Sequence, residues 1–200
     1  MNRFIRLVGL AFAAVVGMHT AVQAAQQLMP TRSFLVTNST GSPAKRKIVF
    51  KVGKGTPDTV VGNPTTDGAT LEVKLANGTM QCFHLPAAGW APIGNFGYRF
   101  TDFTGTSGVT KATIKRTGPG GFGLAIRATG KRGATIDVLP QSGTTGFDLN
   151  LALRGGDAYC AGGATPVGAT NTDTVYNVKN VPAPGVCGVA ACSPSGAFLD

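Results

Sequence analysis

The sequence predicts an all-β protein: a single antiparallel β-sandwich or partly closed barrel of about eight strands, preceded by a signal peptide. Two observations carry this prediction. Short runs in which apolar and polar residues alternate recur along the chain, and Gly or Pro bounds them. The 200 residues include 29 Gly and a single Glu, Glu72, a composition typical of many turns and few helices.

The clearest pair of strands lies at residues 69–85. Every second residue from 69 to 75 is apolar, which is typical of a strand with one buried face. Asn77 and Gly78 follow, and this pair favours the positive φ angles of a type I′ hairpin turn. The chain returns as far as Pro86, which cannot donate to a ladder. The return strand is expected to point Phe83 and Leu85 inward and Cys82 and His84 outward.

The rest of the chain shows the same alternation in shorter runs. Further strands are expected at residues 46–52, 97–102, 109–116, 122–129, 134–139, 147–153 and 158–161. From Gly162 onward the composition predicts a loose segment that docks one short strand at 175–178. The expected organisation is a flexible lead-in at 25–44, one β domain at 45–187 and a loose C-terminal tail at 188–200.

Residues 1–24 have the parts of a secretory signal peptide. Arg3 and Arg6 precede an apolar run at 7–16, and Val22-Gln23-Ala24 supplies a small-x-small cleavage site. The run is shorter than the roughly 20 apolar residues that a membrane span requires. We therefore expect a secreted, periplasmic or cell-surface protein, with no transmembrane segment in the mature chain.

The mature chain is basic. Cleavage after Ala24 removes two of the 18 Lys and Arg residues and none of the 9 Asp and Glu, which leaves a formal charge of +7. A positive field favours anionic partners such as acidic polysaccharides, although solubility alone explains such a charge more often. Nucleic acid is not expected as a partner.

Four cysteines lie in the mature part, and an even number in an exported chain is typical of disulfides. Metal binding is the alternative, but no CxxC pair occurs and His84 is the single mature histidine. Four cysteines allow three pairings, and their spacing does not choose among them.

No motif in the sequence specifies a reaction, metal or cofactor. His84 is the one candidate base, and no GxSxG elbow surrounds any serine. The aspartates mostly occupy turns or polar strand faces, where this residue is common: Asp58, Asp67, Asp102, Asp137, Asp148 and Asp157. The glycines at 118–123 lead into a strand and lack the Gly-Lys-Ser/Thr of a phosphate loop. An enzyme is not expected.

Aromatic residues gather after the hairpin: Trp90, Phe96, Tyr98 and Phe103. Such side chains can form a stacking platform for sugars, and more often they cap the open end of a β core. Candidate binding residues on the first interpretation are Trp90, Tyr98 and Arg99.

A series of motifs, in matching order over residues 45–187, resembles an uncharacterised family of secreted all-β proteins from environmental bacteria. The segments are KRKIVFK, FHLPAAGW, GYRFTD, DAYCAGG and YNVKNVPAPGVC. The family pattern is an RKxxF strand, LPxxxW, GYxYxD, YCA and a closing KNxPAPxxC. This resemblance implies export, a β fold and disulfides, and it implies no activity.

The resemblance also bears on the cysteines. Its YC and PAPxxC marks match Cys160 and Cys187, which implies a Cys160–Cys187 bridge and leaves Cys82 to pair with Cys192. Because Cys82 and Cys192 are not regular family marks, a Cys82–Cys160 bridge with a small Cys187–Cys192 loop stays open.

The function expected from all of this is an exported, non-enzymatic module that binds anionic glycans. The alternatives are a structural cell-surface protein or a glycan-active enzyme. Loss of turnover on an envelope polysaccharide after mutation of the loop aspartates would favour the enzyme.

Overall fold

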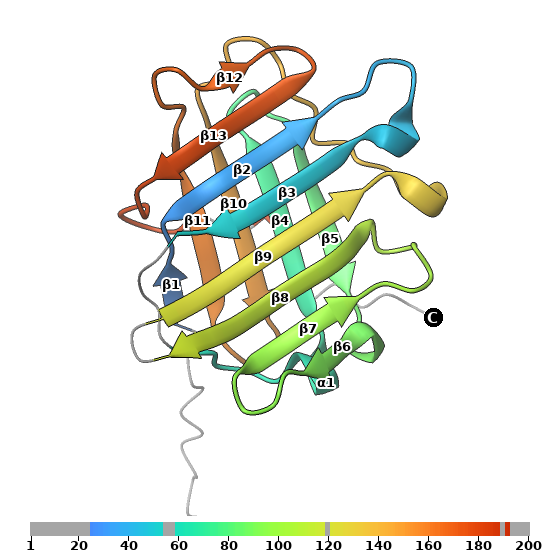
Figure 1. Cartoon of the computed structure of the whole chain (residues 1–200), viewed down its shortest axis with the longest axis vertical. Helices are drawn as coiled ribbons and strands as arrows, with labels where there is room; N and C mark the ends of the chain where they lie inside the picture. The colour runs from blue at the N-terminus through green and yellow to red at the C-terminus, as the bar shows by residue number, and fades with distance from the viewer. Residues whose placement is uncertain (1–24, 54–58, 119–120, 189–190, 193–200) are drawn as a thin grey trace, which may run out of the picture.

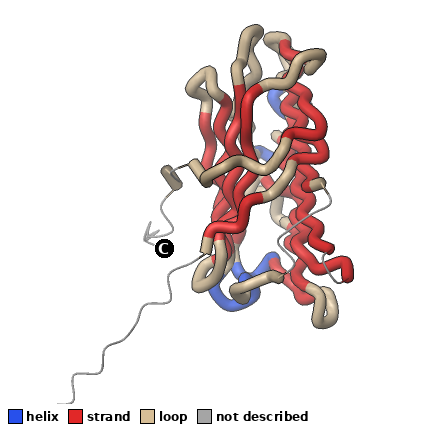
Figure 2. Tube along the Cα trace, turned by 90° about the vertical axis from the view of Figure 1, so that its left-hand side faces the viewer, coloured by secondary structure: helices blue, strands red, loops and turns tan. Residues whose placement is uncertain are grey.

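Two β-sheets pack face to face in the computed structural model of the chain (Figures 1 and 2). The structure describes residues 25–53, 59–118, 121–188 and 191–192. The expected signal peptide at 1–24, Asp58 and most of the expected tail at 188–200 lie outside the described residues. The two sheets are separate, so the fold is the sandwich, and the all-β prediction is confirmed.

The smaller, five-stranded sheet lies at the back in Figure 1. Its strands, in spatial order, are β1 (Gln26–Leu28), β11 (Ala158–Ala164), β10 (Gly146–Leu153), β4 (Ala69–Leu75) and β5 (Met80–Leu85). β1 pairs parallel with β11, and the other pairs are antiparallel.

The larger, eight-stranded sheet faces the viewer in Figure 1 and is antiparallel throughout its described ladders. Its order is β12 (Thr170–Asn171), β13 (Val175–Val181), β2 (Thr31–Thr37), β3 (Lys47–Val52), β9 (Gly121–Thr129), β8 (Val109–Gly118), β7 (Gly97–Thr101) and β6 (Trp90–Pro92). Four single-turn helices lie in the connections: η1 (Pro43–Lys45), α1 (Pro64–Asp67), η2 (Ala87–Gly89) and η3 (Lys131–Gly133).

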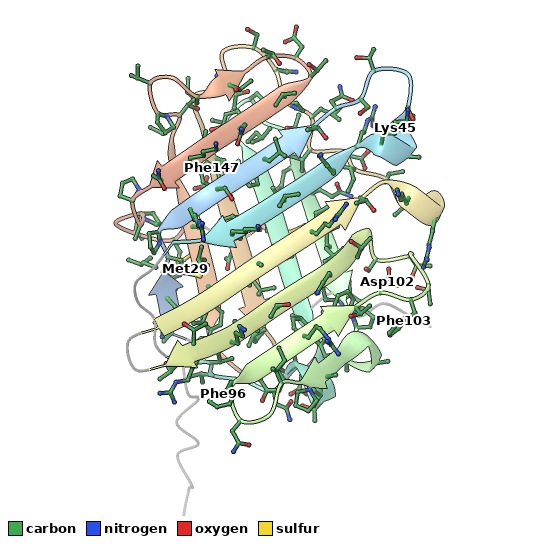
Figure 3. The ribbon with its side chains drawn as sticks, viewed as in Figure 1. Met29, Lys45, Phe96, Asp102, Phe103 and Phe147 are labelled. Carbon is green, nitrogen blue, oxygen red and sulfur yellow. A yellow bond between two sulfur atoms is a disulfide. The ribbon has the colours of Figure 1, made fainter. Side chains whose placement is uncertain are left out.

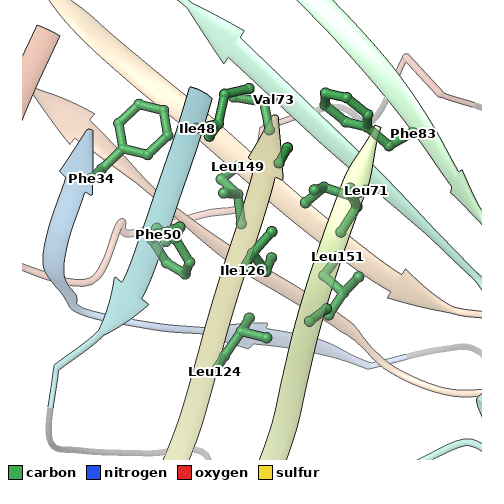
Figure 4. Packing of buried hydrophobic residues seen from close by; sticks show 14 of the residues in the cluster. Phe34, Ile48, Phe50, Leu71, Val73, Phe83, Leu124, Ile126, Leu149 and Leu151 are labelled. Carbon is green, nitrogen blue, oxygen red and sulfur yellow. The ribbon is translucent and has the colours of Figure 1, made fainter. Parts of the chain in front are cut away.

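The core fills the space between the sheets, and alternation along each strand supplies it. On β10 the apolar side chains at 147, 149, 151 and 153 are all buried, as their spacing predicts. Phe147 stacks on Phe34 of the opposite sheet with ring centroids 4.5 Å apart. Leu71, Leu149 and Ile126 continue the contact toward the middle of the sandwich (Figure 4). The two sheets therefore share one hydrophobic core.

The prediction of a flexible lead-in at 25–44 is wrong. β1 and β2 lie in this segment, and β2 is an interior strand between β13 and β3. Met29, Phe34 and Val36 are fully buried. The polar neighbours of these residues obscured a strand whose apolar side chains occupy alternate positions. The β domain therefore begins well before residue 45.

The loose segment predicted after Gly162 is also wrong in part. β11 continues to Ala164, and the short strand expected at 175–178 is β13, seven residues long and paired along β2. Tyr176 and Val178 are buried in the core. Burial of these two side chains holds the segment to the sheet.

Residues 134–139, predicted as a strand, are extended but form no ladder with a described strand. Alternate side chains of this segment are buried, as the pattern predicted. Its backbone bonds instead to side chains. Gln81 Nε2 donates to Thr135 O (3.0 Å), and Asp137 N donates to Gln81 Oε1 (2.8 Å). Arg46 donates to Ile136 O, and Asn77 and Thr79 donate to Leu139 O, so side chains take the place of a neighbouring strand.

The β4–β5 hairpin confirms the predicted strands and corrects the predicted turn. Gly78 has a φ of +91°, but Asn77 does not have a positive φ, so the turn is not type I′. Gly78 N donates to Leu75 O (3.0 Å) and Leu75 N to Thr79 O (2.9 Å). A three-residue loop that ends in a left-handed glycine produces this pattern. Phe83 and Leu85 are buried, and Cys82 and His84 are exposed, as predicted.

Candidate functional site

Most of the charged residues of the described strands lie in the eight-stranded sheet. Its strands contain nine basic residues: Arg32, Lys47, Lys51, Arg99, Lys111, Lys115, Arg116, Arg127 and Lys179. No described strand of this sheet contains Asp or Glu. Seven of the nine alternate with core residues and so point outward, and we call them the basic face: Lys47, Lys51, Arg99, Lys111, Lys115, Arg127 and Lys179.

Strand register brings the basic face together from distant parts of the sequence. Lys111 on β8 is opposite Arg127 on β9, and Val49 on β3 is opposite Arg127 on its other side. Lys51 lies two residues from Val49 along β3, so several cations fall within about 10 Å of one another at ordinary strand spacing. At physiological salt such charges reinforce one another over about 8 Å.

A groove of about 550 Å³ runs over β9 on this face, and we call it the basic groove. It forms because Gly123 and Ala125 place little side chain there. Lys115 pairs with Gly123 from β8, and Lys51 pairs with Ala125 from β3, so a lysine stands on each side. Arg32 and Asn180 also line it. Small residues in the floor and cations along the walls suit an extended anionic chain.

The three binding candidates from the sequence do not form one site. Trp90 is only 6% exposed: its ring lies 5.4 Å from that of Phe100, and Nε1 donates to Leu85 O (3.3 Å). Trp90 therefore packs in the core, in agreement with the interpretation that it caps the open end of the β core. Arg99 points out from β7 onto the basic face, whereas the half-buried Tyr98 points to the other side of the same strand.

Tyr98 borders a second depression of about 450 Å³, at the end of the sandwich where the Phe96 loop lies (Figure 3). Asn95, Phe96 and Arg116 also line it. We call it the end pocket. Phe96 is 60% exposed, which is unusual for so large an apolar side chain beside a formed pocket.

The outer face of the five-stranded sheet is built differently. Cys82 bonds Cys192 and Cys160 bonds Cys187, the pairs that the resemblance implied. Ladder register places Cys82, Glu72, Asn150 and Cys160 in one row across β5, β4, β10 and β11. The two bridges therefore fasten the C-terminal segment at both ends of that row.

Glu72 anchors the same segment between the bridges. This side chain is 6% exposed, and its Oε2 accepts the backbone N–H groups of Ala191 (2.7 Å) and Cys192 (2.9 Å). A carboxylate that accepts two amides in a buried setting forms strong, charge-assisted hydrogen bonds. A smaller cavity of about 290 Å³ remains beside it, lined by Lys74, Asp148 and Asn150 among others.

Most of the described aspartates accept hydrogen bonds from the protein itself, either within their own loop or from a distant segment. Asp102 accepts hydrogen bonds from Thr104, Gly105 and Ser107, and Asp157 accepts from Ala25 N (3.1 Å). Burial acts to raise the pKa of Asp102, but these hydrogen bonds outweigh it and lower the pKa to about 2. Such a carboxylate is ionised and holds the loop in shape.

His84, the candidate base of the sequence, lies exposed on β5 opposite Thr70. Partial burial and the nearby positive charge of Arg154 lower its pKa, so it is neutral near pH 7. Among the described residues no group of three or more His, Cys, Asp or Glu side chains could hold a metal ion.

No helix in the described part of the chain is long and apolar enough to cross a membrane. Searches of protein-family models, curated proteins and solved structures found no match to this chain.

Proposed function

We propose that this protein is an exported, non-enzymatic binding module that holds an anionic polysaccharide on the basic face. The observation that carries the proposal is the charge of the eight-stranded sheet: its strands contain nine basic residues, and none of its described strands contains Asp or Glu. An uncompensated field of one sign on one face attracts polyanions and favours rapid association.

The shape of the face supports a linear polymer as the ligand. The basic groove borders five strands, since its lining comes from β13, β2, β3, β9 and β8. Lys51 and Lys115 stand on opposite sides of its small-residue floor. Repeated acidic groups on a flexible sugar chain can meet such cations in several registers, which suits a polysaccharide of regular charge spacing.

Co-sedimentation of the oxidised mature protein with an acidic and a neutral polysaccharide tests the proposal, at about 50 mM and about 500 mM salt. We expect binding to the acidic polymer that weakens as salt rises. The double variant Lys51→Gln/Lys115→Gln should bind about tenfold more weakly at low salt, through loss of two groove cations. Gly123→Val should also weaken binding by filling the groove. A Cβ at Gly123 meets only ordinary contacts, the nearest at 3.5 Å, so the fold tolerates it.

The matched control removes two exposed lysines from outside the eight-stranded sheet: Lys74→Gln/Lys131→Gln. This variant has the same net charge as the groove variant. Equal loss of binding in both would mean that overall charge, and not the basic face, attracts the polymer. No binding at either salt concentration would favour a structural cell-surface protein instead. Tighter binding to nucleic acid than to the acidic polysaccharide would show that the ligand is a nucleic acid and not a polysaccharide.

A further inference from the structure

We infer that the end pocket is a subsite for a single acidic sugar ring, a hexuronic-acid residue of the bound polymer. The inference rests on the proposed function for the class of ligand. It adds a site of different chemistry, because cations dominate the charged lining of the basic groove, whereas the end pocket combines the exposed ring of Phe96 with polar donors.

The exposed Phe96 belongs to a fixed loop. Ile93 N donates to Gly97 O (2.7 Å), Phe96 N donates to Ile93 O (3.0 Å), and Arg116 N donates to Phe96 O (2.7 Å). Gly97 has a φ of +150°, where other residues are strained, so the loop requires glycine there. The backbone on both sides of Phe96 is thus held by hydrogen bonds while the ring stays 60% exposed. A ring held in this way is pre-organised for stacking.

Three polar side chains complete the end pocket: Asn95, Tyr98 and Arg116. In the part of the chain that the structure describes, no protein group hydrogen-bonds any of these side chains. The amide, the phenol and the guanidinium can therefore donate to a ligand. A volume of about 450 Å³ lies within the usual range of small-ligand sites.

A hexuronic-acid ring matches these groups one by one. Its C–H face is apolar and can stack on Phe96. Its hydroxyl groups can accept from Asn95 and Tyr98, and its carboxylate can accept two parallel hydrogen bonds from Arg116. A bare phosphate or sulfate would leave the aromatic ring without a stacking partner, and a neutral sugar would give the guanidinium no carboxylate for two parallel, charge-assisted hydrogen bonds.

The end pocket and the basic groove meet on β8. Lys115 lines the groove and Arg116, the next residue, lines the end pocket on the other side of the strand. Consecutive Cα atoms are 3.8 Å apart. A polymer lying in the groove can therefore turn around the end of β8 and place one ring against Phe96.

A hexuronic-acid trisaccharide tests the subsite, because it is too short to cover the basic face. Calorimetric titration of the oxidised mature protein should give binding at least tenfold tighter than that of the matching neutral trisaccharide. Phe96→Ser and Arg116→Gln should each weaken binding about tenfold, and Arg116→Lys should restore part of the loss. Amide shifts in NMR spectra should move at Asn95, Phe96 and Gly97.

Two variants are matched controls. Phe103→Ser removes another exposed phenylalanine, 80% exposed on a different loop (Figure 3), and Lys131→Gln removes an exposed cation outside the eight-stranded sheet. Both should bind the trisaccharide within about twofold of the unmodified protein. Equal affinity of Phe96→Ser and the unmodified protein would overturn the subsite, as would tighter binding of a mononucleotide.

These outcomes separate the subsite from the proposed function. Polymer binding that depends on Lys51 and Lys115 but not on Phe96 would support the basic face as the binding site and contradict the subsite. Binding of the trisaccharide without binding of the polymer would contradict the proposal that the basic face binds the polymer.

Discussion

The outer faces of the two sheets differ although their inner faces follow one rule. Inner side chains on both sheets alternate along the strands and meet in a common core, where Phe34 stacks on Phe147. Outside, the eight-stranded sheet is open and basic, whereas the five-stranded sheet is crossed by the C-terminal segment between two disulfides. The strands of the five-stranded sheet contain Lys74, Glu72 and Asp148 as their Lys, Arg, Asp and Glu residues.

The charged groups on the two outer faces differ in what they contact. On the five-stranded sheet a carboxylate stabilises the protein itself, whereas the cations of the eight-stranded sheet are available to a partner. Glu72 accepts hydrogen bonds from two backbone amides, so its charge stabilises the protein's own C-terminal segment. The lysines of the basic face have no such acidic neighbour within their sheet. Outer positions are free of the packing constraints of the core, and residues there can be selected for a partner.

Removal of the disulfide that closes the longer loop should cause the largest loss of stability. Cys82 and Cys192 are 110 residues apart, and Cys160 and Cys187 are 27 apart. In the chain-entropy model, Cys82→Ser/Cys192→Ser should lower the free energy of unfolding by about 5 kcal/mol, and Cys160→Ser/Cys187→Ser by about 3.5 kcal/mol. Urea unfolding without reductant measures both. A larger loss for the shorter bridge would contradict the expectation.

Glu72→Gln should have the next largest effect. The amide keeps one acceptor oxygen but loses the charge, so the two hydrogen bonds to Ala191 and Cys192 weaken. We expect a loss of about 2 kcal/mol in the free energy of unfolding and faster hydrogen exchange at those two amides. Lys74→Gln, an exposed neighbour on β4, should change stability by less than about 0.5 kcal/mol. Equal losses in the two variants would show that Glu72 does not hold the segment.

Asp102 provides the smallest expected effect, on a loop that belongs to the open sheet. Because its folded pKa of about 2 lies below the ordinary aspartate value of 3.8, its contribution to stability is fully present above pH 3.8 and is lost as pH falls through about 2. Asp102→Asn should destabilise the protein by about 1 kcal/mol at neutral pH.

An acid titration followed by NMR checks this expectation. The amide shifts of Thr104, Gly105 and Ser107 should titrate near pH 2. Shifts that titrate near the ordinary aspartate pKa of 3.8 would contradict the account of the loop. Asp137→Asn is a suitable control, since among the described residues this carboxylate accepts a single hydrogen bond, from the Thr135 hydroxyl at 3.2 Å.

Much of the fold could be predicted because alternation is a local property. The strands at 69–75 and 147–153 follow from period-two burial, which any strand with one buried face must show. Residues 134–139 show the limit of this rule. Their side chains alternate as in a strand, but the strand state depends on a backbone partner, and here side chains such as Gln81 and Asn77 supply the hydrogen bonds.

The candidate site was only partly visible in the sequence. Arg99 and Tyr98 were identified, but adjacent residues on a strand point to opposite faces, so they lie in different sites. The basic groove was missed because its parts, Arg32, Lys51, Lys115, Gly123 and Asn180, come from five strands. The sequence did contain a signal: in KIVFK and in KATIK, two lysines four residues apart lie on the strand face opposite to the buried apolar residues.

The sequence by itself determined the all-β class, the faces of most strands, the even set of cysteines and the basic charge, because each depends on composition or on neighbours along the chain. Tertiary structure alone decided that β2 is an interior strand, that Trp90 is buried and that the lysines of β3 and β8 face one groove across β9. Those facts depend on register between segments tens of residues apart. Register is fixed by the packing of the whole core and not by any single strand.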